Sequence, residues 1–240
     1  MLRGDGRPMK LREALQIPRG LTAVIGGGGK STLLLRLGRE LAKDGERVLL
    51  CASTHMFAPP GIPLATTLPR AAALLESDRL VCFGCPGEDG KLTQGAPMED
   101  ILPLATYVLC EADGSKGLPL KAHASYEPNV PRETKRLVYV VGLDGIGERI
   151  AVAAHRPACY AALLGTDAEH RVTPRDAAAA IRKEGYEAAG AVLFLNKAEG
   201  ERLAWGRQVA AHWPGRAVIA ALQSPEVIGE VWENGTKQEM

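Results

Sequence analysis

The sequence has no excess of either charge and few aromatic residues. Its 240 residues include 29 lysines and arginines against 28 aspartates and glutamates, and aromatics make up 5%. A basic face for nucleic acid or an acidic interaction tail would unbalance these counts. We therefore expect no nucleic-acid partner.

Long hydrophobic runs are missing as well. The longest apolar stretches have the length of a strand, whereas a membrane span needs roughly 18 to 20 apolar residues. The amino-terminal stretch MLRGDGRPMKLREAL has no apolar core of the kind that signal peptides carry. These features predict no membrane partner and a cytoplasmic location.

Cysteines are few and irregularly spaced. The five of them form no pattern typical of a disulfide framework in a chain of this size. Cys82 and Cys85 make one CxxC without a second pair, so a metal or redox site is disfavoured there. Cys51, Cys82 and Cys110 each fall at or near the end of an expected strand, and we interpret all three as small buried apolar residues.

Apolar runs rich in Val, Ile and Leu alternate with helical patterns along the whole chain. The runs are continuous, as in strands buried on both faces of a parallel sheet. We predict one α/β domain over residues 1–240, a three-layer sandwich with a mostly parallel sheet, P-loop-containing nucleotide hydrolase-like. The expected strands are 21–25, 47–52, 79–83, 106–110, 136–142, 191–196 and 217–222, and the expected helices are 31–45, 68–77, 156–165, 173–185 and 201–213.

The stretch GGGGKST follows the first expected strand and opens a helix. The usual phosphate-loop spacing would require glycine where Val24 stands, so the motif is a shortened one, G-x-x-G-K-S. Backbone amides and a helix N-terminus can still converge on an anion, with Lys30 on the β- and γ-phosphates and Ser31 on Mg²⁺. A glycine turn that only allows close helix packing is the alternative. The predicted nucleotide-binding residues here are Gly26, Gly27, Gly28, Gly29, Lys30, Ser31 and Thr32.

The segment TYVLCEADGSKGLPLKAH has acids directly after a buried strand. Glu111 or Asp113 would hold Mg²⁺, as a carboxylate at the end of such a strand does in phosphoryl-transfer enzymes. Lys116 and Lys121 follow and would line an anionic ligand site. A solvated turn is the alternative interpretation.

The segment CASTHM follows the second strand. Ser53, Thr54 and His55 would lie close to the glycine loop if the two strands are neighbours. Thr54 could then contact Mg²⁺ or the γ-phosphate, and a capping or turn role is the alternative.

The stretch LFLNKAEG places Asn196, Lys197 and Glu199 after another strand. It resembles the base-reading N-K-x-D element of GTPase-like folds, with Glu199 in place of aspartate. An ordinary strand-to-helix turn explains the pattern equally well.

In the stretch AHRP, Arg156 could stabilise charge on a transferred phosphoryl group, or simply lie on a helix surface.

Several blocks occur in the order and spacing of one family. GGGGKST, RVLLCASTHM, EADGSKGLPLKAHASYEPNVP, VVGLDGIG, RVTPRDAAAAI and LFLNKAE resemble the YqeC-type proteins, which are selenium-dependent hydroxylase accessory proteins. The resemblance implies a role in maturation of molybdenum hydroxylases that carry a selenium-containing cofactor. The most specific part of the resemblance is the block EADGSKGLPLKAHASYEPNVP, which is far longer than a generic nucleotide motif.

The resulting hypothesis is an Mg²⁺-dependent NTPase or small-molecule kinase that uses ATP or GTP. Its partners would be a selenium- or molybdenum-cofactor intermediate and a client hydroxylase. A Mur-ligase-like ATP-dependent ligase and a nucleotide-switched binding module remain alternatives. Expected catalytic residues are Lys30, Asp113, Lys116, Lys121 and Arg156, and expected metal ligands are Ser31, Thr54, Glu111 and Asp113.

Overall fold

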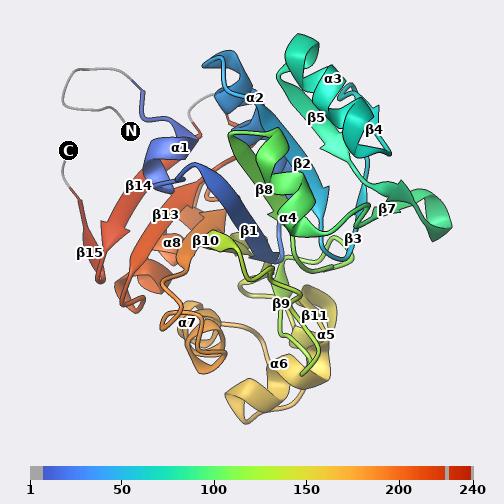
Figure 1. Ribbon diagram of the computed structural model, residues 1–240. Helices are drawn as coiled ribbons and strands as arrows, with labels where there is room; N and C mark the ends of the chain where they lie inside the picture. The colour runs from blue at the N-terminus through green and yellow to red at the C-terminus, as the bar shows by residue number, and fades with distance from the viewer. Residues whose placement is uncertain (1–7, 225–226, 239–240) are drawn as a thin grey trace.

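A large, mostly parallel sheet organises the protein in the computed structural model, which describes residues 8–224 and 227–238 (Figure 1). Its strands are β1 (Gly20–Gly26), β2 (Val48–Ala52), β4 (Leu64–Ala65), β5 (Leu80–Phe83), β8 (Tyr107–Glu111), β10 (Thr134–Gly142), β12 (Val192–Asn196), β13 (Arg216–Ala220), β14 (Ile228–Glu233) and β15 (Thr236–Lys237). Within the described ranges the order is β15-β14-β13-β12-β10-β1-β8-β2-β5-β4. Pairing is parallel from β13 to β4, and antiparallel where β14 and β15 extend the other edge.

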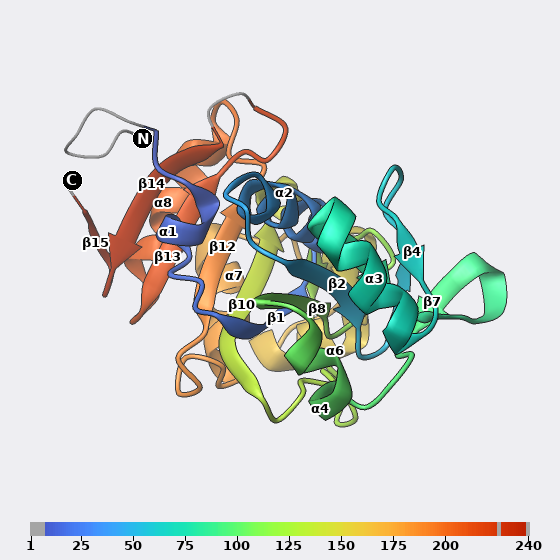
Figure 2. The ribbon, with the colours of Figure 1, turned by 45° about the horizontal axis from the view of Figure 1, so that its top comes forward.

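Helices cover both faces of the sheet. They are α1 (Leu11–Ala14), α2 (Lys30–Lys43), α3 (Leu68–Asp78), α4 (Met98–Ile101), α5 (Ile150–Ala153), α6 (Pro157–Leu164), α7 (Pro174–Lys183) and α8 (Arg202–Ala211). One face packs on α1 and α2, through residues such as Val24 and Leu37. On the opposite face, α6, α7 and α8 cover the β10–β13 half, and α3 and α4 cover the β8, β2 and β5 half (Figure 2). The architecture is α/β with helical layers on both sides of the sheet, as predicted.

All seven expected strands and all five expected helices are present, with ends that shift by no more than two residues. The antiparallel pair β14–β15 was missed, as were two small sheets. These are β3 (His55–Phe57), β7 (Lys91–Thr93) and β6 (Cys85–Pro86), which pair together, and β9 (Leu120–Lys121) with β11 (Ala154–His155). Most of the missed strands have only two or three residues, too short for a periodic pattern.

The strand order decides which loops meet. Because β1 lies between β8 and β10, the carboxyl ends of these three strands share one edge, and β12 ends beside β10. The condition for placing Ser53, Thr54 and His55 beside the glycine loop, that the strands at 21–25 and 47–52 are neighbours, is not met, since β8 separates them. Ser53 instead contacts the segment after β8: its N–H donates to the carbonyl of Glu111 at 3.1 Å, and its hydroxyl donates to the carbonyl of Asn129.

Three cysteines are buried in the sheet. Cys51, Cys82 and Cys110 pack as small apolar side chains, as interpreted from the sequence. In the described part of the chain, no cluster of three or more His, Cys, Asp or Glu side chains could hold a metal ion. No helix in that part is long and apolar enough to cross a membrane.

Candidate functional site

The loop between β1 and α2 has a backbone that only glycine adopts readily. Gly26, Gly28 and Gly29 have φ values of +94°, +80° and +127°. A side chain on Gly26 would also overlap the carbonyl oxygen of Val140, and one on Gly27 would come within 2.6 Å of the carbonyl oxygen of Leu118. The glycine run is therefore required by close approach of three chain segments.

Three of the loop amides are already bonded inside the protein. The N–H of Gly26 donates to Asp113 Oδ2 at 2.8 Å, that of Gly27 to a β10 carbonyl at 2.9 Å, and that of Gly28 to the carbonyl of Leu118 at 3.0 Å. At the start of α2, Gly29 offers no side-chain cap and the first turn has no acid. The N–H groups of that turn have no intrahelical partner, so they are the ones oriented to bind an anion.

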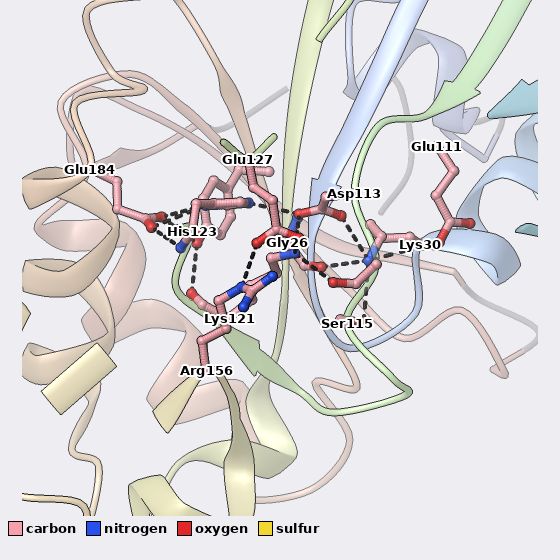
Figure 3. Close-up of polar contacts among 12 residues, drawn as sticks. Gly26, Lys30, Glu111, Asp113, Ser115, Lys121, His123, Glu127, Arg156 and Glu184 are labelled. Atoms are coloured by element: carbon pink, nitrogen blue, oxygen red, sulfur yellow. Dashed lines mark hydrogen bonds and ion pairs between the residues drawn. The ribbon is translucent and has the colours of Figure 1, made fainter. Parts of the chain in front are cut away.

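Lys30 is the first residue of α2 and is only 3% exposed. Its Nζ donates to the carbonyl of Gly26 at 2.6 Å and to Ser115 Oγ at 3.2 Å. Two carboxylates flank the ammonium group, Asp113 Oδ1 at 3.0 Å and Glu111 Oε1 at 3.9 Å (Figure 3). The predicted phosphate-contacting lysine therefore lies directly under the glycine loop.

Ser31 and Glu111 form the second pair at this edge. The Ser31 hydroxyl donates to Glu111 Oε2 at 2.9 Å. Burial raises the pKa of Glu111, and the charge of Lys30 and the Ser31 hydrogen bond only partly offset this effect. Hydroxyl and carboxylate oxygens are the ligands that Mg²⁺ takes, with water and phosphate oxygens completing its shell. The pair fits a magnesium ion. The predicted ligand Thr54 has a buried hydroxyl that makes no hydrogen bond within the described structure.

Asp113 has a different environment from Glu111. Its side chain is fully buried, and Oδ2 accepts from the N–H of Gly26 at 2.8 Å and from His123 Nε2 at 2.7 Å. Lys121 Nζ lies 3.5 Å from the same oxygen. Burial opposes ionisation, but the His123 hydrogen bond and the charges of Lys30 and Lys121 outweigh it and lower the pKa of Asp113 to about 2. These contacts orient Asp113 toward the cations, whereas Glu111 accepts from Ser31.

The sequence reasoning missed His123 and Glu184. His123 Nδ1 lies 3.0 Å from each Glu184 oxygen, and the Tyr139 hydroxyl donates to Glu184 Oε2 at 2.8 Å. Burial favours neutral His123, but its hydrogen bonds to Asp113 and Glu184 prevail and raise the pKa of the imidazole. The KAH stretch could have indicated His123. Nothing in the sequence around Glu184, in the turn after α7, marks it as a partner.

The charge on His123 makes the stability of the protein pH-dependent. A group whose pKa is raised by folding stabilises the fold fully below its unfolded pKa, here 6.5, and loses that contribution as the pH rises through its folded pKa. The excess stability of wild type over His123→Gln should therefore be largest below pH 6.5 and shrink at higher pH. Urea unfolding of both proteins between about pH 6 and pH 9 measures this difference. A constant or growing difference contradicts a charged His123.

Glu127 joins Lys121 to Arg156. Lys121 Nζ donates to the carbonyl of Gly114 at 2.5 Å and lies 3.2 Å from Glu127 Oε1. Arg156 Nε donates to Glu127 Oε2 at 2.5 Å. Despite partial burial, Arg156 and Lys121 lower the pKa of Glu127 to about 2. The two predicted cations are thus brought together by an acid that the sequence reasoning did not select.

The predicted base-reading residues lie on the β12 side of the loop. Asn196 Nδ2 donates to the carbonyl of Gly28 at 2.8 Å, so this side chain supports the glycine loop. Lys197, at φ +64°, donates to Asp144 Oδ2 at 2.6 Å. Glu199 is exposed. The Asn196 side chain therefore supports the glycine loop through a contact within the protein, which needs no bound base.

The structure brings together most of the predicted residues. Thr32 and Lys116 are exposed at the rim of the site. Contacts join the glycine loop to the others, namely Lys30, Ser31, Glu111, Asp113, Lys121, Arg156 and Asn196.

Comparison with known proteins gives one consistent result. The family model described as YqeC protein matches residues 22–158, which include the glycine loop, the segment from Glu111 to Glu127, and Arg156. Glu184 and Asn196 lie beyond the matched range. An uncharacterised protein named YqeC from Escherichia coli (strain K12) is 33% identical over 196 residues, covering 76% of this chain and 73% of that protein. The chain belongs to the YqeC family.

Proposed function

We propose that this protein binds a nucleoside triphosphate with Mg²⁺ in a P-loop-type site and transfers or hydrolyses its terminal phosphate. The observation that carries the proposal is the position of Lys30. It is a buried lysine at the start of an uncapped helix, under a strained glycine loop and beside the Ser31–Glu111 pair. A buried ammonium is costly unless it is paired or used, and helix N-termini with free amides favour phosphate.

Each residue then has a role set by its contacts. The first-turn amides of α2 and the Lys30 ammonium bind the phosphate oxygens and balance charge that develops during transfer. Ser31 and Glu111 would hold Mg²⁺, which would supply positive charge to neutralise the phosphates. Asp113 acts as a positioning residue because it holds both the Gly26 amide and Lys30. Water or an acceptor oxygen attacks the terminal phosphorus, the bond to the bridging oxygen breaks, and the nucleoside diphosphate leaves.

The wider biological role follows from the family resemblance. We propose that the protein is an accessory factor in maturation of selenium-dependent molybdenum hydroxylases, with ATP or GTP as the nucleotide. Its second substrate would be an intermediate of that cofactor chemistry.

A thermal-shift panel tests the nucleotide site. We expect ATP or GTP with Mg²⁺ to stabilise the wild type by about 2.7 kcal/mol at a concentration near 100 times the dissociation constant. Lys30→Ala should lose this ligand-induced shift, because the phosphate charge has lost its main partner. Lys43→Ala removes an exposed lysine at the other end of α2 and should keep it. Equal shifts in all three proteins, or none in wild type, would refute the proposal.

One observation also favours a nucleotide-switched binding module. A chain of ionic contacts runs from Lys30 through Asp113 and His123 to Glu184, at the carboxyl end of α7. A phosphate that attracts Lys30 would change the balance of charge along this chain. Hydrolysis stimulated by a client protein and unaffected by small acceptors would identify a switch, and the reverse would identify a kinase.

A further inference from the structure

The turn at residues 115–118 places Lys116 in a backbone conformation that lysine rarely adopts. The N–H of Leu118 donates to the carbonyl of Ser115 at 3.0 Å, and the two central residues, Lys116 and Gly117, have φ values of +51° and +77°. Positive φ at both central positions is typical of a type I′ turn, where Gly, Asn and Asp predominate. A lysine with left-handed backbone is disfavoured, so a turn selected only for shape would carry another residue.

Both ends of this turn are attached to the glycine loop. Ser115 Oγ accepts from Lys30 Nζ at 3.2 Å, and the carbonyl of Leu118 accepts from the N–H of Gly28 at 3.0 Å. The turn is therefore held against the predicted phosphate site from two sides. Lys116 is exposed, so its ammonium group is free to reach a ligand beside that site.

Lys121 connects further basic groups to this turn, because its Nζ donates to the carbonyl of Gly114, directly before Ser115. Strands β9 and β11 pair in parallel and place Lys121 opposite His155, and Arg156 follows with φ +63°. Partial burial lowers the pKa of His155, and so do the charges of Lys121, Arg156 and Lys116, against the opposing charge of Glu127. The surroundings of His155 are therefore electropositive even though Glu127 is ionised.

We propose that Lys116, together with His155 and Arg156, binds an oxyanion group of the second substrate. The acceptor is then a small molecule that carries its own phosphate, sulfate or carboxylate, held beside the nucleotide's terminal phosphate. This inference rests on the proposed function, because it is the nucleotide site that makes the neighbouring anion an acceptor. Arg156 takes part through its terminal N–H groups, while its Nε donates to Glu127 and its guanidinium stacks 5.1 Å over the Tyr126 ring.

Removal of the lysine together with its backbone strain gives a specific test. Lys116→Gly deletes the side chain at a position where glycine is conformationally preferred, so its thermal midpoint should stay within about 2 °C of wild type or rise. Arg79→Gly is a matched control, because Arg79 is an exposed basic residue with φ +57° at the end of α3. Lys116→Arg keeps the charge. Each protein is saturated with Mg²⁺ and a non-hydrolysable triphosphate, and inorganic phosphate is titrated by calorimetry.

We expect Lys116→Gly to weaken phosphate binding at least about tenfold, the effect of losing one charged contact. Wild type, Lys116→Arg and Arg79→Gly should bind phosphate alike, and all four should bind the triphosphate alike. If Lys116→Gly weakens the triphosphate and leaves phosphate unchanged, Lys116 serves the nucleotide and the acceptor site is refuted. Equal phosphate affinity in all four proteins, or no binding in wild type, also refutes it.

Failure of the proposed function would be recognised separately. If no triphosphate binds any of the four proteins, the nucleotide role is wrong, and the phosphate titration is repeated without nucleotide. Weaker binding in Lys116→Gly alone would then support an oxyanion site at Lys116, and equal binding in all four would refute it.

Discussion

Replacing Asp113 with alanine is expected to lower the free energy of unfolding by about 3 to 5 kcal/mol. The change removes a carboxylate that three buried cationic side chains share, those of Lys30, Lys121 and His123. It also leaves the amide of Gly26 without its hydrogen-bond acceptor. Loss of a carboxylate from a buried ionic network is costly because no water replaces it, even though each cation keeps a second carboxylate partner. Urea unfolding at neutral pH measures the change.

A second ion pair at the same edge gives the control. Asp144 pairs with Lys197 at 2.6 Å, but the two side chains are 29% and 36% exposed. Water can solvate each partner when the other is lost, so Asp144→Ala should cost no more than about 1 kcal/mol. If Asp113→Ala is as mild as Asp144→Ala, the network around Asp113 does not hold the loop in place.

Gly26→Ala is expected to destabilise the protein by about 3 kcal/mol, the sum of left-handed strain and overpacking. Its Cβ would overlap the carbonyl oxygen of Val140, which belongs to the adjacent strand β10 and cannot move without disturbing the sheet. Because the residue also begins the proposed phosphate loop, the proposed nucleotide-induced stabilisation should disappear in the same variant.

Gly45→Ala separates the two causes. Gly45 has a similar φ of +86°, but no atom lies within 4 Å of its added Cβ. It should cost only about 1 to 2 kcal/mol, the strain alone. Chemical denaturation of both variants gives the comparison. Equal losses would mean that the contact between β1 and β10 relaxes freely around a side chain.

The fold was largely predictable because its strands are buried on both faces. Their apolar runs are continuous, and the helices between them have clear apolar stripes, so elements such as β1, α3 and β12 appear within one residue of their expected ends. The short pairs β9–β11 and β6–β7 were not predictable. Strands of two or three residues form because the surrounding structure brings them together, and they leave no periodic pattern.

The candidate site was predictable where its residues form a local motif. Lys30 and Ser31 follow a glycine run at a helix start, and Glu111 and Asp113 end a buried strand, so each pair is visible in a few consecutive residues. His123 and Glu184 are 61 residues apart and meet only through packing of the segment after β9 against the turn after α7. Glu127 escaped notice for the same reason, since its partner Arg156 is 29 residues away.

By itself the sequence determined the parallel α/β architecture, the shortened glycine loop and the acids that face it, because these depend on local periodicity and on neighbours in the chain. Only the tertiary structure decided how the charges are shared. The strand order places β8 directly beside β1 and moves β2 one position away, so Ser31 pairs with Glu111 while Asp113 holds Lys30 and the Gly26 amide. Continuous apolar strands reveal that a sheet is parallel, but they carry no information about their order, and ion-pair energies depend on distances that only that order sets.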